Sequence, residues 1–269
     1  YEFGIRDCWI VNVGDLKLHE VPLSYFLSLA YDFDKWGSVN PNSAKEYRSL
    51  FVKNNFPCAS EDVRAKIETV WKEYTDITGL RRPESLHAGI YHPCNYNETK
   101  RMLLACEKVE KLSKEVYDAL NADEKNAYYS MIHFSAMAGM NLVKMHLYAG
   151  LNAHYVNQGR PVANRYAEMV KECLKKDKAL ADEFGAFKDK KWNGMQLAAH
   201  IGFTKWNEDG WRNPVVSYIE PVNAPRLSVS RADDSFIAVK NYGAPMSIVV
   251  DDFAYEGCDK VELEIANDG

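Results

Sequence analysis

Polar residues gather where the first apolar run of the chain ends. Residues 8–13 are apolar except for Asn12, and Asp15, Lys17 and Glu20 follow within a few positions. Such a run, without alternation, is typical of a strand covered on both faces. In α/β proteins the polar residues at the carboxyl end of a buried strand are where chemistry is usually placed. The four polar residues are therefore candidates for chemistry, and the alternative is a buried strand with a merely polar turn.

A second group combines aromatic rings, amides and cations near the end of a long apolar segment. Tyr155 and Arg160 lie there, and His200 and Trp206 come later in the chain. Amides and hydroxyls can bond sugar hydroxyls, an aromatic face can stack on a pyranose, and an arginine can hold a carboxylate. The composition fits a uronic-acid site, although the same groups could instead satisfy helix ends and loop backbone. The other members of the group are Asn152, His154, Gln158, Asn164, Thr204 and Lys205.

Other kinds of site have little support in the sequence. There is no G-x-S-x-G nucleophile motif and no glycine-rich phosphate loop. His146 and His154 lie in the apolar segment, where isolated histidines are usually core residues. The six cysteines are scattered, with no C-x-x-C pair and no histidine at ligand spacing, so we expect small buried hydrophobes rather than a zinc site. We expect no cofactor and no metal.

Composition narrows the range of partners. The chain has 269 residues and a net charge of -5, which argues against bulk attraction to nucleic acid or to an anionic membrane. No segment approaches the run of about 20 apolar residues that a membrane helix needs.

Most of the chain has helical periodicity. From about 98 to 120 apolar residues recur at steps of three and four, which predicts an amphipathic helix. The segment from Asn121 to Asn157 is the least polar and carries many small residues, as expected of the central helix of a bundle. Further helices are predicted over 22–31, 43–51, 60–79 and 161–176.

The texture changes after Pro221, where short β-type runs alternate with Asn, Gly and Asp. We predict strands over 227–230, 236–240, 247–250 and 260–265, as in the start of a β-sandwich. In the last strand Leu263 and Ile265 alternate with Glu262 and Glu264, which predicts that the glutamates lie on a solvated face.

The strand at 8–13 needs neighbours for its backbone hydrogen bonds, and no comparable run follows it before the C-terminal region. We therefore expect this chain to be a piece of a larger protein, or a domain whose first strand joins a sheet made elsewhere. The interpretation as an enzyme depends on this strand. Finding residues 8–13 coiled on the surface would count against it.

Several stretches together resemble glycoside hydrolase family 115, the xylan α-1,2-glucuronidases. They follow the order of the family through about residue 220, and we regard them as specific at the family level. The matching segments are WIVNVGDLK with Glu20, the RRPE loop with NYNE, DEKNAYY, YVNQGR followed by AN, and KWN with HIGFTKW.

The resemblance implies a mainly α fold: a helical bundle domain preceded by a βα unit of a (β/α)8 barrel and followed by the start of a β-sandwich. The domains would be 1–40, 41–220 and 221–269. It implies an inverting hydrolase that releases glucuronic acid, or its 4-O-methyl form, from xylan or a related glycan. Because most of the barrel would lie elsewhere, we expect this chain alone to lack the full catalytic pair.

The resemblance also gives roles to individual residues. Asp15 and Glu20 become the catalytic candidates. Asn12 and Lys17 become substrate contacts beside them, and Tyr155, Arg160, His200 and Trp206 are the substrate-binding candidates of the helical domain. Further expectations are a homodimer and a secreted or periplasmic location in a bacterium.

The chain departs from the family pattern at three positions. Leu18 stands where the family commonly has Pro, Gly194 where it has His, and Ala199 where it has a polar residue. These departures leave another glucuronate-capped glycan open as substrate. The alternatives to an enzyme are a non-catalytic carbohydrate-binding module and a helical scaffolding domain.

Overall fold

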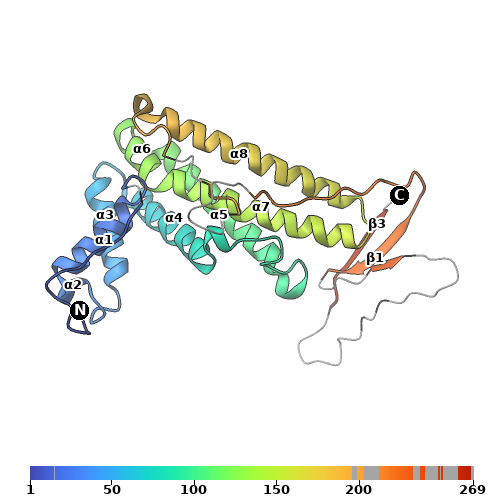
Figure 1. Cartoon of the computed structure of the whole chain (residues 1–269), viewed down its shortest axis with the longest axis horizontal. Helices are drawn as coiled ribbons and strands as arrows, with labels where there is room; N and C mark the ends of the chain where they lie inside the picture. Colours follow the sequence, from blue (N-terminus) through green and yellow to red (C-terminus); the bar gives the residue numbers. More distant parts are fainter. Residues whose placement is uncertain are drawn as a thin grey trace. The chain divides into compact units, whose positions relative to one another are not determined.

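The structure is a computed structural model, and it describes residues 1–14, 16–195, 199–202, 212–232, 237–239, 248, 250 and 260–267. It is mainly helical, as the sequence predicts, with a small sheet near the C-terminus (Figure 1). The helices are α1 (Glu20–Tyr31), α2 (Phe33–Trp36), α3 (Ser43–Asn55), α4 (Glu61–Leu80), α5 (Glu98–Ala119), α6 (Ala122–Tyr128), α7 (Phe134–Asn157) and α8 (Val162–Lys190). Short 3-10 turns cover Pro83–Ser85 and Asn95–Asn97, and a π-helical turn covers Tyr129–His133.

The chain forms two compact units. The first comprises residues 1–80, 107–140 and 180–197, and the second comprises 81–106, 141–179 and 198–269. These units follow compactness rather than the order of the sequence. The division into domains 1–40, 41–220 and 221–269 therefore stays a prediction.

In the first unit an aromatic core lies where α7 begins and α8 ends. Tyr129, Phe134 and Phe184 are buried together, and we call them the Phe184 cluster. The Phe134 and Phe184 rings lie 4.5 Å apart between centroids. Burial raises the pKa of the Tyr129 phenol. Half-buried side chains packed on the cluster are Leu18, Tyr117, Ala138, Leu180, Phe187 and Trp192.

Helix ends confirm some of the sequence signals and correct others. Ser60 caps α4 by accepting the backbone N–H of Val63 at 3.2 Å, and Asn121 caps α6 by accepting those of Asp123 and Glu124. Ser43 followed three residues later by Glu46 has the sequence pattern of a capping box. The box does not form, because Ser43 is already helical and Glu46 accepts from the side chain of Asn40 instead.

In the second unit α7 and α8 form a hairpin. Gly159 ends α7 with φ +66°, a left-handed conformation that favours glycine, as the sequence predicts. Away from this turn, the Asn141 side chain of α7 donates to the backbone carbonyl of Cys173 in α8 at 2.9 Å, which links the two helices.

The sheet has the order β2-β1-β3, with both pairs antiparallel. Figure 1 labels β1 and β3. The strands are β1 (Leu227–Arg231), β2 (Ile237–Val239) and β3 (Leu263–Asn267). They confirm three of the four predicted strands, and most of the fourth, 247–250, lies outside the described residues. The orientation predicted for the last strand is wrong: Leu263 and Ile265 are 45% and 68% exposed, whereas the alternate residue Glu264 is half-buried.

Residues 8–13 do not form the expected strand. They are coil, with Ile10 90% exposed and Val11 40% exposed. A strand needs a partner strand, and the described part of the chain places none beside this segment. Trp9 packs on α1 and α2, with its ring centroid 5.9 Å from that of Phe26 and 6.1 Å from that of Phe33. The structure therefore does not confirm the βα unit of the predicted fold, and the sequence argument for an enzyme loses its first support.

Within the described residues no helix combines the length and the hydropathy that crossing a membrane requires.

Candidate functional site

Lys17 and Glu20 form an ion pair at the start of α1. The Lys17 side chain is 11% exposed and that of Glu20 is 32% exposed. The second carboxylate oxygen of Glu20 is buried and has no hydrogen-bond partner among the described residues. Between the two, Leu18 has φ +74° and packs on the Phe184 cluster, so a left-handed turn directs the pair back over the core.

Trp192 lies beside this pair and belongs to a segment distant in sequence. The Lys17 ammonium is 5.4 Å from the centroid of the Trp192 ring, and the Lys191 ammonium is 4.8 Å from it. Both are within the range of cation–π attraction. Two of the sequence motifs, VGDLK and KWN, therefore meet in the first unit. The place brings together a carboxylate, an ammonium and an indole.

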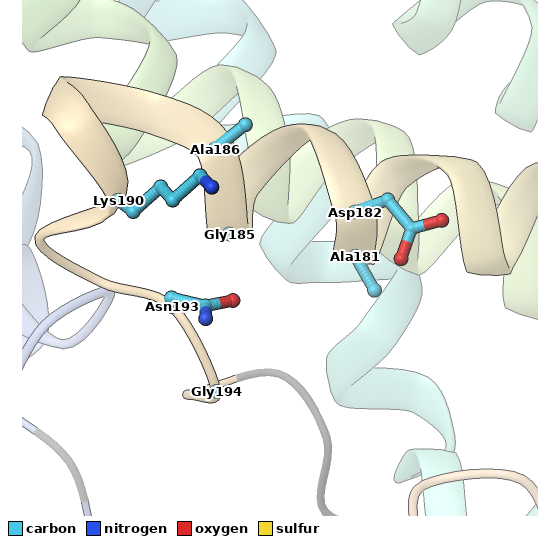
Figure 2. A pocket seen from close by; sticks show the side chains of 7 residues that line it. All are labelled: Ala181, Asp182, Gly185, Ala186, Lys190, Asn193 and Gly194. Atoms are coloured by element: carbon cyan, nitrogen blue, oxygen red, sulfur yellow. The ribbon is translucent and has the colours of Figure 1, made fainter.

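A small hollow adjoins the turn that carries Trp192 (Figure 2). It has a volume of about 200 Å³ and is lined by Ala181, Asp182, Gly185, Ala186, Lys190, Asn193 and Gly194. In Figure 2 the Lys190 and Asn193 side chains extend in the same direction from the end of α8 and the turn after it. The volume is below the roughly 300 to 1,000 Å³ of ordinary ligand pockets, so the hollow suits one polar group rather than a whole ligand.

The second unit holds another cluster of ionisable groups, built on the turn between α7 and α8. The Arg160 side chain is 3% exposed and forms a forked ion pair with Glu264 of β3, with Nη1–Oε2 at 3.2 Å and Nη2–Oε1 at 3.3 Å. The Tyr155 hydroxyl donates to the same carboxylate at 3.4 Å. Tyr166 stacks on Tyr155, with centroids 5.5 Å apart and planes within 2°.

Burial dominates the electrostatics around Arg160. It raises the pKa of the Tyr155 and Tyr166 phenols, and the Glu264 carboxylate raises both further. It lowers the pKa of His154, whose Nε2 lies 3.7 Å from the Cys94 sulfur. Tyr155 therefore acts as a neutral hydrogen-bond donor in this cluster.

The amides of Asn152 and Asn164, which are candidates for binding sugar, instead bind backbone groups of the chain. Asn152 exchanges two hydrogen bonds with the backbone of Ser217, and Asn164 exchanges two with the backbone of Ile219, all between 2.8 and 2.9 Å. Each asparagine thus takes the place of a partner strand for an extended segment, which we call the strap (residues 212–222). The alternative stated for these amides, satisfaction of backbone groups, is the one the structure supports.

His200 pairs with Asp177, and the remaining predicted site residues are not part of either cluster. The Nε2 atom of His200 lies 2.9 Å from Oδ1 of Asp177. Asn12 is exposed in the N-terminal coil. Asp15 and Trp206 lie outside the described residues.

The sequence patterns did not predict two residues of these clusters, Trp192 and Glu264, as site residues. Trp192 was visible only as part of the KWN motif, and its proximity to Lys17 comes from the fold. The alternating pattern of the last strand predicts a solvated face for Glu264, because it predicts that Leu263 and Ile265 are buried.

No metal centre is assembled in the part of the chain that the structure describes, since no group of three or more His, Cys, Asp or Glu side chains is placed to hold an ion. Cys94, Cys106 and Cys173 are buried, as predicted, whereas Cys8 and Cys58 are exposed.

Comparison with known proteins places the motif-bearing N-terminal segment in a class, the glycoside hydrolases. The sequence model of glycosyl hydrolase family 115 matches residues 1–85, so this segment is similar to members of that family. The match includes Lys17 and Glu20, and the KWN and YVNQGR motifs lie beyond it. A comparison with curated proteins found no match.

Proposed function

We propose that this chain belongs to an α-glucuronidase-like enzyme that removes glucuronic acid, or its 4-O-methyl form, from xylan or a related glycan by inverting hydrolysis. The observation that carries the proposal is the family match over the segment with Lys17 and Glu20. The meeting of this segment with Trp192 supports it, because a carboxylate, an ammonium and an indole face are suited to binding a sugar.

Inverting hydrolysis assigns a task to the N-terminal motif. One carboxylic acid protonates the leaving oxygen while a carboxylate about 6.5 to 9.5 Å away activates water on the opposite face of the sugar. We assign Asp15 and Glu20 to the water side of the reaction, with Asn12 and Lys17 contacting the substrate. The rest of the pair would come from a (β/α)8 barrel of the parent protein, which would also supply partner strands for residues 8–13.

The helical domain offers further candidates for binding the glycan. Arg160 and Tyr155 have the fork and the phenol that a uronate carboxylate needs, and His200 and Trp206 remain candidates for contacts with the glycan. A homodimer and a secreted or periplasmic location in a bacterium complete the proposal.

The test is an assay of the parent protein on an aldouronic acid and on a glucuronate-capped arabinogalactan oligosaccharide. We expect free uronic acid whose anomeric configuration, followed by NMR, is inverted. Asp15→Asn and Glu20→Gln are expected to reduce the rate at least about a hundredfold, as for a positioned acid or base. Asp7→Asn, in the exposed coil of the same segment, should leave the rate unchanged. Absence of uronic acid from both substrates would refute the proposal.

A non-catalytic carbohydrate-binding module is the second candidate. The exposed coil at 8–13 favours it, because the strand that would join a barrel is not formed here. Calorimetric binding of the oligosaccharides without turnover by the parent protein would support this candidate over the enzyme.

A further inference from the structure

Arg160 belongs to a rigid receptor. Its backbone N–H donates to the carbonyl of Tyr155 at 2.9 Å, and its own carbonyl accepts from Ala163 at 3.0 Å. The guanidinium lies 5.1 Å from the centroid of the Tyr155 ring, and Tyr166 backs that ring by parallel stacking. Guanidinium and phenol are therefore both held in place by the α7–α8 turn, whichever carboxylate approaches them.

The carboxylate that fills this receptor comes from a less firmly held element. β3 has five residues and lies at an edge of the described sheet, where it pairs with β1. The Glu264 side chain is 41% exposed, compared with 3% for Arg160. Leu263 and Ile265 on either side of it point outward and are 45% and 68% exposed. Because these two neighbours bury little apolar surface, they contribute little to holding Glu264 in its position.

The geometry is that of carboxylate recognition by an arginine fork, with both carboxylate oxygens engaged and the Tyr155 hydroxyl on one of them. The three distances, 3.2, 3.3 and 3.4 Å, are longer than the roughly 2.7 to 2.9 Å of a strong charge-assisted hydrogen bond. A carboxylate that is not tethered to a strand could come closer to both donors.

We propose that Arg160 and Tyr155 form a binding site for the carboxylate of a uronic acid, and that Glu264 occupies this site as an internal competitor until the sugar acid displaces it. The choice of a uronic acid rests on the proposed function; the competition by Glu264 rests on the geometry alone. The apparent affinity for the sugar is then reduced by the fraction of molecules in which Glu264 has left the site.

The first experiment measures binding of D-glucuronate and of D-glucose to the chain by calorimetry. Glu264→Gln keeps the size of the side chain and removes its charge. It is expected to bind glucuronate at least about tenfold more tightly than wild type, which corresponds to an open fraction of about a tenth or less in the wild type. Glu262→Gln, an exposed position on the same segment, is the matched control and should equal wild type. Glucose should bind to none of the three proteins.

A second variant tests the receptor. Tyr155→Phe in the Glu264→Gln background removes only the phenol oxygen and is expected to weaken glucuronate binding about fivefold, as for one lost hydrogen bond. Equal binding of glucuronate by wild type, Glu264→Gln and Glu262→Gln, or equal binding of glucose and glucuronate, would overturn the proposal.

A measurement on the wild-type chain does not depend on the folding of any variant. Saturating glucuronate, but not glucose, is expected to speed amide hydrogen exchange in residues 263–267 by releasing β3. Unchanged exchange would overturn the competition. The two proposals fail separately: uronic acid release by the parent protein without a Glu264 effect refutes only this inference, and a Glu264 effect without hydrolysis refutes only the enzyme.

Discussion

Asn152 and the backbone of Ser217 exchange two hydrogen bonds, with Nδ2 donating to the carbonyl at 2.8 Å and the Ser217 N–H donating to Oδ1 at 2.9 Å. Asn164 repeats the arrangement two residues further along the strap at Ile219. Spacing by two residues matches the period of an extended chain, in which alternate backbone groups face the same side. The strap is thus bound to α7 and α8 through its backbone.

The strap should depend on these asparagines. Asn152→Ala removes both bonds to Ser217 and a third to the carbonyl of Ala163, and we expect a loss of about 2 to 3 kcal/mol in the free energy of unfolding. Denaturant titration measures the loss, and amide exchange at Ser217 should rise. Asn157→Ala, at the exposed end of α7, should change stability by less than about 0.5 kcal/mol. Equal effects of the two changes would contradict the role of the strap.

His146 should make the chain sensitive to acid. It is 3% exposed, neither ring nitrogen has a hydrogen-bond partner among the described residues, and burial lowers its pKa from 6.5 to about 4. Below pH 6.5 the unfolded state takes up the proton while the folded state does not, so stability falls as the pH drops towards 4. The loss is about 3 kcal/mol at most.

His146→Leu should remove that part of the pH dependence, which urea titrations at pH 7 and pH 4.5 would show. A His146→Leu protein that loses as much stability on acidification as wild type would refute the assignment.

One substitution should have opposite effects at two glycines. A Cβ at Gly150 would lie 2.4 Å from the carbonyl oxygen of Ala88, so Gly150→Ala must push the loop away from α7 and should destabilise the chain by about 1 to 3 kcal/mol. A Cβ at Gly79 would meet nothing within 4 Å, and Gly79→Ala in the last turn of α4 should stabilise it by about 0.5 kcal/mol. Thermal unfolding measures both. A stabilising Gly150→Ala would show that the close approach is absent.

The Lys17–Glu20 pair should be stronger than a surface pair. A double-mutant cycle with Lys17→Met and Glu20→Gln is expected to give a coupling of about 1 kcal/mol or more, because the lysine is largely buried. Lys72 and Asp76 form an ion pair on α4 with both side chains more than half exposed, and the same cycle there should give less than about 0.5 kcal/mol. Equal couplings would mean that the first pair is an ordinary surface contact.

Local signals in the sequence predicted the helices well and the site only in part. The period of three to four residues, the Ser60 and Asn121 caps and the Gly159 stop depend on neighbours in sequence, and the structure confirms them. The apolar run at 8–13 wrongly predicted a strand, because such a run becomes a strand only beside another strand. The pattern also failed at β3, where Glu264 pairs with Arg160 of the α7–α8 turn while Leu263 and Ile265 are exposed.

The sequence by itself determined the mainly helical fold, the resemblance to family 115 and the residue types suited to a uronic acid, since these follow from composition, local periodicity and motifs. Only the tertiary structure decided that Lys17 lies beside Trp192 and that Asn152 and Asn164 bind the strap. It also decided that Arg160 pairs with Glu264. Such contacts join residues far apart along the chain. Their formation depends on how helices and strands pack, which no local pattern encodes.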